Sequence, residues 1–372
     1  MPDLVSIDEI RSAADRLDGV VLRTPLVPFA RADPPLLIKA ESLQPTGAFK
    51  LRGAYSAISA LPADQRARGV VAHSSGNHAH AVAYAAALLG VRATVVVPVN
   101  APEVKVAAAR LLGAQIVSCE PSLAARAAVT AQLAAQHGYA QIPPFEHRDV
   151  IAGQGTIGLE IAADFPEVDL VVCPIGGGGL ISGIAAALAA TRPGTRVVGV
   201  EPELAADARD SFRARRRVAW PSADTQRTIA DALRADQIGE LPMLHLLSQV
   251  HDVITVTDDE IRAAMRLLAT GARLIAEPGG AVAVAACLFR ASELPAASNR
   301  VAILSGGNVD PALLASVLGS TPAPVGPAPA PHGAAPASGD ATAGSAAPAS
   351  NGAAAAPGRA MPAPGRAANT SG

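Results

Sequence analysis

The feature that most constrains the fold of this chain is the alternation of short β-branched runs with alanine-rich stretches of helical length. Apolar runs that show no polar alternation are typical of parallel strands buried on both faces of a sheet. Two of the alanine-rich stretches end at Gly90 and Gly113, and glycine commonly stops a helix. The alternation therefore predicts an α/β fold with parallel sheets, with strands expected at 36–41, 70–75, 92–98, 114–119, 168–176, 196–202 and 300–307.

Composition changes abruptly near the end of the chain. From about Thr321 onward the sequence is almost entirely proline, alanine, glycine and serine. Such a segment cannot bury enough apolar surface to offset the entropy lost on ordering, so we expect residues 320–372 to form a disordered tail. The remaining residues suffice for two coupled α/β domains. We expect a large domain from 1–68 and 147–319, with a small domain from 69–146 inserted into it.

The charge, the cysteines and the apolar runs exclude several classes of protein. The formal net charge is −2 and the arginine-rich run at 213–217 is typical of a solvated face, so no nucleic-acid partner is expected. Cys119, Cys173 and Cys287 lie far apart, which argues against disulfides or a zinc site and for buried thiols. The amphipathic, acidic start is unlike a signal peptide, and no apolar run could span a bilayer. We therefore expect a cytoplasmic protein with no membrane partner.

The first candidate for chemistry is Lys50, which follows a glycine-containing turn and is flanked by Phe49 and Leu51. A partly apolar setting lowers the pKa of a lysine and makes its amine available as a nucleophile or base. Taken alone, the motif also fits an ordinary surface lysine at the start of a helix.

A second motif, His-Ser-Ser-Gly-Asn-His-Ala-His at 73–80, follows an expected strand and opens an expected helix. Ser74, Ser75, Asn77 and the first amides of the helix can bind a carboxylate. The alternative is a helix cap built from Ser75 or Asn77, and both interpretations can hold together.

Two glycine-rich turns follow other expected strands, where ligands of α/β folds bind. Between a buried strand and an alanine-rich helix, consecutive glycines let backbone amides converge on a phosphate. The first of these turns, at 176–179, matches neither the P-loop nor the dinucleotide-binding pattern. A merely flexible turn is the alternative. The second turn carries Ser305, which could exchange a hydrogen bond with a ring nitrogen or belong to an ordinary turn. The phosphate-binding candidates are Gly176, Gly177, Gly178 and Gly179.

These motifs occur together in the order QPTGAFKLRGA, SSGNHA, PFEHRDVIAGQGTIGLEI, IGGGGLISG and SGGN. The combination, over roughly residues 6–319, resembles the fold-type II enzymes of the serine/threonine dehydratase and serine racemase family, which use pyridoxal 5′-phosphate (PLP). The resemblance implies a fold like that of the tryptophan synthase β chain, with PLP between two α/β domains, and a homodimer. It also implies that Lys50 bonds the PLP aldehyde and takes the substrate α-proton.

The resemblance further assigns roles around the cofactor and the substrate. Phe49 would pack beside the PLP ring, Asn77 would contact the ring hydroxyl, and Ser305 would face the pyridine nitrogen. In the racemases, the position of Ser75 is also the second base, on the opposite ring face. Arg126 would approach the distal group of the substrate, with a salt-bridged helix arginine as the alternative. The substrate carboxylate would be held by Ser74, Ser75, Gly76, Asn77 and His78.

A second site is implied by cation-dependent members of the family. Glu201, the backbone carbonyl of Ala205 and Asp207 would bind Mg²⁺, Ca²⁺ or Mn²⁺ through hard oxygen ligands. Two solvated carboxylates after a strand are the alternative. The chain departs from the family at Ala232, where a glycine is usual near the cofactor edge. It also has Pro45 where the nucleotide-activated racemases carry lysine, so ATP activation is not expected.

The leading functional hypothesis is dehydration and deamination of L-threonine or L-serine to a 2-oxo acid and ammonia. The stretch PFEHRDVIAGQGT resembles dehydratases, and a neutral Ser305 does not enforce protonation of the pyridine nitrogen, which favours prompt elimination. The alternatives are an amino acid racemase that uses Lys50 and Ser75, a 3-hydroxyaspartate dehydratase, and a non-catalytic PLP-binding or scaffold protein.

Overall fold

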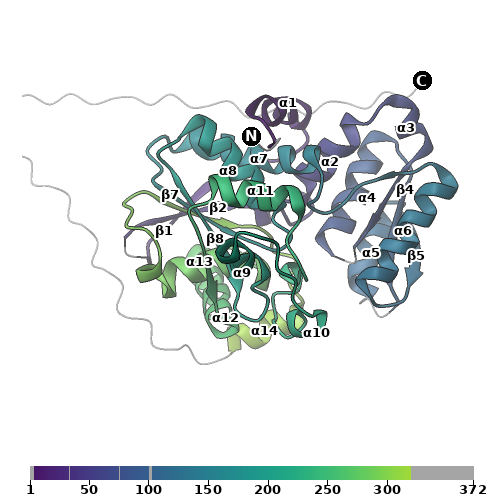
Figure 1. The fold of residues 1–372 in the computed structure, drawn as a ribbon. Coiled ribbons are helices and arrows are strands. Elements are labelled where there is room, and N and C mark those ends of the chain that lie inside the picture. The colour runs from purple at the N-terminus through teal and green to yellow at the C-terminus, as the bar shows by residue number, and fades with distance from the viewer. Residues whose placement is uncertain (1–3, 33, 75, 100–102, 320–372) are drawn as a thin grey trace, which may run out of the picture. The chain divides into compact units, whose positions relative to one another are not determined.

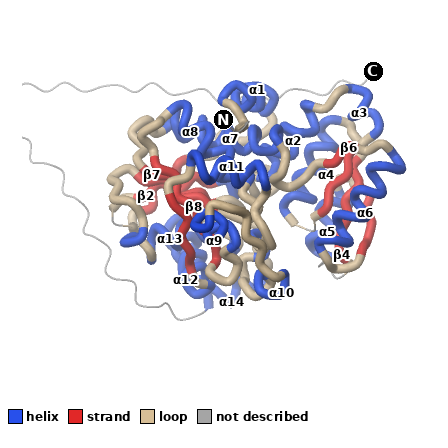
Figure 2. The backbone as a smooth tube through the Cα atoms, viewed as in Figure 1, coloured by secondary structure: helices blue, strands red, loops and turns tan. Residues whose placement is uncertain are grey.

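The computed structural model describes residues 4–32, 34–74, 76–99 and 103–319, without the side chains at 103–105 and 123. The predicted tail at 320–372 and the predicted site residue Ser75 lie outside the described residues. The described residues belong to one compact unit, Met1–Pro329. They form two sheets with helices packed against them (Figures 1 and 2). The predicted α/β class with parallel sheets is confirmed.

The larger sheet has six strands in the order β1-β2-β10-β7-β8-β9. All neighbours are parallel except β1, which pairs antiparallel with β2. Alternate residues of its central strands face opposite clusters, because Leu170 and Val172 join one and Val171 and Cys173 the other. The strands are β1 (Leu26–Phe29), β2 (Leu36–Ala40), β7 (Leu170–Pro174), β8 (Arg196–Pro202), β9 (Asp252–Val256) and β10 (Arg300–Leu304).

Helices cover both faces of this sheet. The helix α13 (Pro278–Phe289) packs on one face together with α12 (Asp258–Leu267). The other face carries α7 (Arg148–Asp164), α8 (Gly179–Thr191) and α11 (Glu240–Gln249). Burial on both faces explains why β7 and β10 read as continuous apolar runs.

The smaller sheet has four parallel strands in the order β5-β4-β3-β6, and all of them lie between residues 70 and 141. The helix α2 (Lys50–Ala60) packs against α4 and against α7. The strands are β3 (Val70–His73), β4 (Ala93–Pro98), β5 (Gln115–Cys119) and β6 (Ala140–Gln141), and the helices are α4 (Asn77–Leu89), α5 (Glu103–Leu111) and α6 (Leu123–His137).

Each of the predicted strands is present, and three strands were missed. β1 contains Pro28 and pairs antiparallel at an edge, β6 has two residues, and β9 begins with a half-buried Asp252. Gly90 ends α4 in the left-handed conformation, as predicted, with φ 64°. The three cysteines are free and buried, as predicted.

Short helices complete the described part of the chain. Ser6 and Glu9 form a capping box at α1, and Thr257 and Glu260 form another at α12. No helix among the described residues is long and apolar enough to cross a membrane. The remaining elements are α1 (Ile7–Leu17), η1 (Glu41–Leu43), α3 (Ala63–Arg68), α9 (Asp207–Ala214), α10 (Ser222–Thr225), η2 (Asp231–Leu233), the π-helical η3 (Leu268–Ala272), η4 (Ala291–Glu293) and α14 (Pro311–Gly319).

Candidate active site

Lys50 is the first residue of α2, and its side chain is half-buried. Its Nζ donates a hydrogen bond to the carbonyl oxygen of Pro144 at 2.8 Å and lies 5.0 Å from the centre of the Phe49 ring. Burial lowers the pKa of Lys50 to about 8, and the negative charge of Glu277 opposes this shift. The backbone N–H of Phe49 donates to the carbonyl of Ser305 at 3.0 Å, which ties the lysine turn to the end of β10.

The four-glycine turn joins β7 to α8, and close packing requires glycine there. Gly178 has φ +92°, a conformation that L side chains rarely adopt. A Cβ at Gly177 would lie 2.2 Å from the ring of Phe145, and one at Gly179 would lie 2.9 Å from the Cβ of Phe145. No side chain caps the start of α8, so its first backbone N–H groups can bind an anion.

The lysine and the glycine turn meet at one short segment of the chain. The carbonyl of Pro144 accepts the hydrogen bond from Lys50, and the next residue, Phe145, packs on Gly177 and Gly179. This segment belongs to the stretch of sequence that resembles the dehydratases. The two motifs singled out for the aldehyde and the phosphate of the cofactor are therefore neighbours in space.

Asn77 brings the smaller sheet to the same place. It begins α4, its Nδ2 donates to Glu277 Oε1 at 2.6 Å, and its Oδ1 accepts from Asn308 Nδ2 at 2.8 Å. Asn308 Nδ2 also donates to the carbonyl of Thr46, four residues before Lys50. The amide of Asn77 is thus held from both sides, by Glu277 at the start of α13 and by Asn308 in the turn after β10.

Glu277 is a site residue that the sequence analysis missed. It is buried, precedes Pro278 at the start of α13, and raises the pKa of Lys50 against the effect of burial. A Cβ at Gly306 would lie 2.4 Å from Glu277 Oε1, which explains the glycine there. An acidic residue directly before Pro-Gly-Gly and an apolar helix was the available signal, because a carboxylate is favoured at the start of a helix, although the Glu277 side chain makes no capping hydrogen bond.

The substrate motif is described in part. Ser74 Oγ accepts from the backbone N–H of Gly76 at 3.2 Å. The Nε2 of His78 lies 2.8 Å from the carbonyl of Ile142, so this nitrogen carries the proton. Burial lowers the pKa of His78 to about 3, helped by the charge of Lys50, so the imidazole is neutral. A carboxylate at the start of α4 would therefore meet backbone N–H groups rather than this side chain.

Comparison with known proteins decides the family. The sequence model of the family described as pyridoxal-phosphate dependent enzymes matches residues 17–306. The chain belongs to this family. It is 40% identical over 306 residues to the L-threo-3-hydroxyaspartate ammonia-lyase of Saccharomyces cerevisiae, covering 81% of this chain and 93% of that protein. It is 39% identical over 313 residues to the L-threonine ammonia-lyase of Thermotoga maritima, covering 82% and 76%. The structure of maize serine racemase superposes with a TM-score of 0.80 at 39% identity, covering 84% and 96%.

The residues present fit the cofactor that gives the family its name. The glycine turn and the uncapped start of α8 suit a phosphate, and the lysine with the lowered pKa lies beside them. Ser305 directly follows β10, accepts the hydrogen bond from the lysine turn through its carbonyl, and is buried. The family includes both ammonia-lyases and racemases, and their identities to this chain are almost equal.

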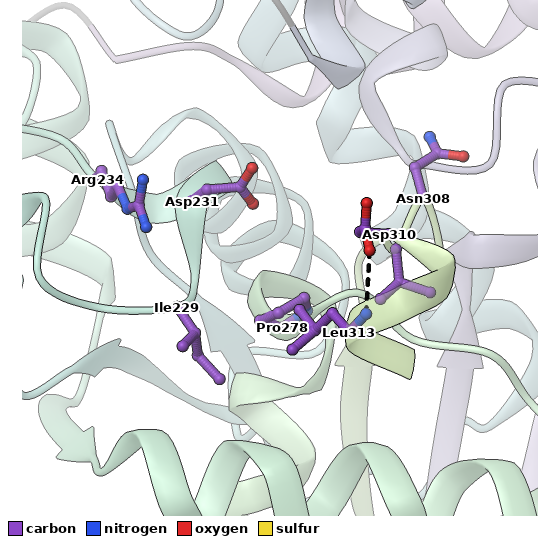
Figure 3. A pocket seen from close by; sticks show the side chains of 8 residues that line it. Ile229, Asp231, Arg234, Pro278, Asn308, Asp310 and Leu313 are labelled. Atoms are coloured by element: carbon purple, nitrogen blue, oxygen red, sulfur yellow. Dashed lines mark hydrogen bonds between the residues drawn. The ribbon is translucent and has the colours of Figure 1, made fainter. Parts of the chain in front are cut away.

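A hollow of about 290 Å³ adjoins this site (Figure 3). Asn308, which holds Asn77, lines it together with Asp231 and Asp310, and Asp310 Oδ1 accepts a hydrogen bond from the backbone N–H of Leu313 (Figure 3). The next residue after Asp231 is Ala232, whose Cβ would lie 3.2 Å from a Cβ placed on Gly279. The departure at Ala232 therefore lies near the glycine turn, since its carbonyl also approaches Gly176.

Arg126 is half-buried on α6 and lies near the substrate motif. Burial lowers the pKa of His73, and the positive charge of Arg126 lowers it further. His73 is the last residue of β3 and directly precedes Ser74. Arg126 therefore lies on the side of the smaller sheet where the substrate motif begins.

The residues predicted to bind a cation lie together between β8 and α9. Glu201, Ala205 and Asp207 are completely buried. Glu201 accepts hydrogen bonds from the backbone N–H groups of Ala208 and Arg209, at 3.1 and 2.7 Å. Among the described residues, neither carboxylate oxygen of Asp207 has a hydrogen-bond partner of normal geometry.

Electrostatics favours a positive partner for these carboxylates. Burial raises the pKa of Asp207 to about 7, and burial together with the charge of Asp207 raises that of Glu201 well above its ordinary value. Two buried acids whose charges oppose one another fit a divalent cation. The predicted cation ligands are two acidic side chains and one backbone carbonyl. In the described part of the chain, no group of three or more His, Cys, Asp or Glu side chains could hold a metal.

Proposed function

We propose that this enzyme converts a small 3-hydroxy amino acid, L-threonine or L-serine, into a 2-oxo acid and ammonia. The observation that carries the proposal is the half-buried amine of Lys50 beside the glycine turn. PLP, when bound, supplies an electron sink for the electrons left when a bond at the substrate α-carbon breaks. The ammonia-lyases among its relatives support this reaction class.

Lys50 is suited to exchange protons at neutral pH. An amine with a pKa of about 8 has a neutral fraction at pH 7 that is roughly 300-fold larger than one with the ordinary value of 10.5. The neutral amine can bond the aldehyde of the cofactor, and once released it can take the proton from the substrate α-carbon. The carbonyl of Pro144 orients its Nζ.

The other residues of the site would bind the cofactor and orient it. The glycine turn and the start of α8 would hold the phosphate, Asn77 the ring hydroxyl, and Ser305 the pyridine nitrogen. Phe49 lies beside the lysine amine, and Phe145 packs on the glycine turn. The elimination releases the substrate hydroxyl as water, and hydrolysis of the free product imine takes up one water. The net products are therefore one 2-oxo acid and one ammonia.

The test is 2-oxo acid release from L- and D-serine, L- and D-threonine and 3-hydroxyaspartate, with and without Mg²⁺. The unaltered protein should release 2-oxo acid from an L-substrate, whereas Lys50→Ala should release none. Lys50→Arg, which keeps a cation but cannot bond an aldehyde, should match Lys50→Ala. Release by Lys50→Ala would overturn the assignment, and chiral chromatography that shows D-serine without 2-oxo acid would identify a racemase.

One observation favours a second substrate, L-threo-3-hydroxyaspartate. The positive charge of Arg126 lowers the pKa of His73, which directly precedes the substrate motif, so its guanidinium could pair with a second carboxylate there. The relative from Saccharomyces cerevisiae acts on this compound by name. Arg126→Leu should lower kcat/KM for 3-hydroxyaspartate and leave that for threonine unchanged. An equal loss for both compounds would exclude this role.

A further inference from the structure

Four charged side chains contact one another around Arg52, two residues after Lys50 in α2, and the chemistry proposed above does not use them. They are Lys39 on β2, Glu41 on η1, Arg52 on α2 and Glu160 on α7, and we call them the buried quartet. Arg52 and Lys39 are the largest side chains in the described part of the chain that are fully buried. Two cations face two carboxylates, so the quartet is neutral as a whole.

Arg52 makes the central contacts of the quartet. Its Nε and Nη2 donate to the two carboxylate oxygens of Glu41, both at 2.8 Å. Its Nη1 and Nη2 donate to the two oxygens of Glu160, at 2.6 and 3.0 Å. Nη1 also donates to Thr156 Oγ1 at 3.1 Å, and Lys39 donates to Glu160 at 2.5 Å. A planar guanidinium held on two edges has its direction and its register fixed.

The quartet lies at the start of the helix that carries Lys50. Phe49 precedes α2 with no side-chain cap, so the first turn of α2 depends on other contacts. A Cβ on Gly153 would lie 2.5 Å from the carbonyl oxygen of Arg52, and one on Gly53 would lie 2.9 Å from that of Val150. The backbones of α2 and α7 thus touch beside Lys50, and Arg52 fastens this contact.

We propose that Arg52, held by Glu41 and Glu160, is a positioning residue that places the first turn of α2 so that the Lys50 amine lies against Pro144 and near the glycine turn. The proposal rests on the proposed function, because it takes Lys50 as the residue that bonds the cofactor. Stability alone is a poor reason for such a group, since apolar side chains of similar volume often stabilise a core as well or better. The planar guanidinium of Arg52, hydrogen-bonded to two carboxylates, fixes the position of α2 in a way that apolar packing does not.

The main variant is Arg52→Lys, and its matched control is Val253→Ala. The lysine keeps the charge but cannot bridge two carboxylates with a planar fork. Val253 is buried in β9, at the opposite edge of the sheet from β2, so its truncation weakens the fold without touching α2. Both proteins are compared at a temperature where denaturant titration shows them folded.

The first measurement is the rate at which cofactor-free protein forms the covalent link between Lys50 and added PLP, followed by visible absorbance. The second measurement is steady-state kinetics, which gives kcat and KM. Misplacement of a reacting group by about 1 Å can cost about 100-fold in rate. We expect Arg52→Lys to lower the rate of link formation and kcat by about that factor, with KM little changed. Val253→Ala should keep both rates. Equal rates for the two variants would overturn the proposal and leave the quartet a purely structural role.

Two further variants keep every outcome decisive. If Arg52→Lys does not fold, Thr156→Val, which removes one hydrogen bond to Arg52, should slow link formation in the same direction by a smaller factor. An unchanged rate in Thr156→Val would then overturn the proposal. Lys50→Ala distinguishes failure of the proposed function from failure of the role of Arg52. If Lys50→Ala still forms the link with PLP, the proposed function fails. If it forms none while Arg52→Lys behaves like Val253→Ala, only the role of Arg52 fails.

Discussion

Replacing Lys50 with methionine should make the cofactor-free protein more stable at neutral pH, although it abolishes activity. Burial lowers the pKa of Lys50 from its ordinary value of 10.5 to about 8. That difference corresponds to about 3 kcal/mol, which the folded protein loses by keeping this amine protonated at pH 7. A methionine of similar length removes the penalty and places an apolar side chain beside the Phe49 ring, in place of the charged amine that lies 5.0 Å from its centre.

The effect of the Lys50→Met replacement on the free energy of unfolding should depend on pH. The unfolded chain binds the proton of Lys50 more tightly than the folded protein does, because the folded pKa is the lower one. The penalty is therefore fully present below about pH 8 and disappears as the pH rises toward 10.5. Stability of the unaltered protein should rise across this window, and the advantage of Lys50→Met should shrink with it.

The assay is denaturant unfolding of cofactor-free protein from pH 7 to 10.5, for the unaltered chain, Lys50→Met and the control Arg11→Met. Arg11 is an exposed cation on α1, so its replacement should change little. We expect Lys50→Met to gain up to about 3 kcal/mol at pH 7. A loss of stability that stays constant with pH would refute the reasoning.

Three other perturbations have expected outcomes. Glu277→Gln removes the charge that raises the pKa of Lys50, so the pH midpoint for link formation with PLP should fall; an unmoved midpoint would count against the contact. Gly177→Ala places a methyl 2.2 Å from Phe145 and should weaken PLP binding measured by equilibrium titration, whereas Gly194→Ala, where a Cβ meets nothing within 4 Å, should leave it intact. If the predicted cation site is occupied, Mg²⁺ should raise the melting temperature of the unaltered protein and Asp207→Asn should abolish this rise; a rise of equal size in the variant would exclude Asp207 as a ligand.

Local pattern was enough to predict the parallel strands and the glycine turn. Strands such as β7 and β10 are buried on both faces, so their sequence carries a continuous apolar signal. β9 lies at a sheet edge and contains the half-buried polar residues Asp252 and Thr255, and β1 contains Pro28, so neither carries that signal. Edge strands need less burial, and their sequences are correspondingly less distinctive.

Long-range pairing limited what could be predicted of the site. Glu277 acts on Asn77, which lies 200 positions away, and no local pattern reveals that contact. Arg52 stands inside the quoted lysine motif, but its partner Glu160 lies 108 positions further along the chain. Charged residues are usually solvated, so no local pattern predicts that four of them are buried together.

The link between Lys50 and the cofactor is tested most directly by borohydride reduction of the PLP-loaded protein, followed by peptide mass spectrometry. Lys39, Lys50 and Lys105 are the lysines of this chain, so one digest resolves them all. Lys39 is paired with Glu160 in the buried quartet. We expect the reduced pyridoxyl group on Lys50. Its recovery on another lysine, with Lys50 unmodified, would contradict the site described above.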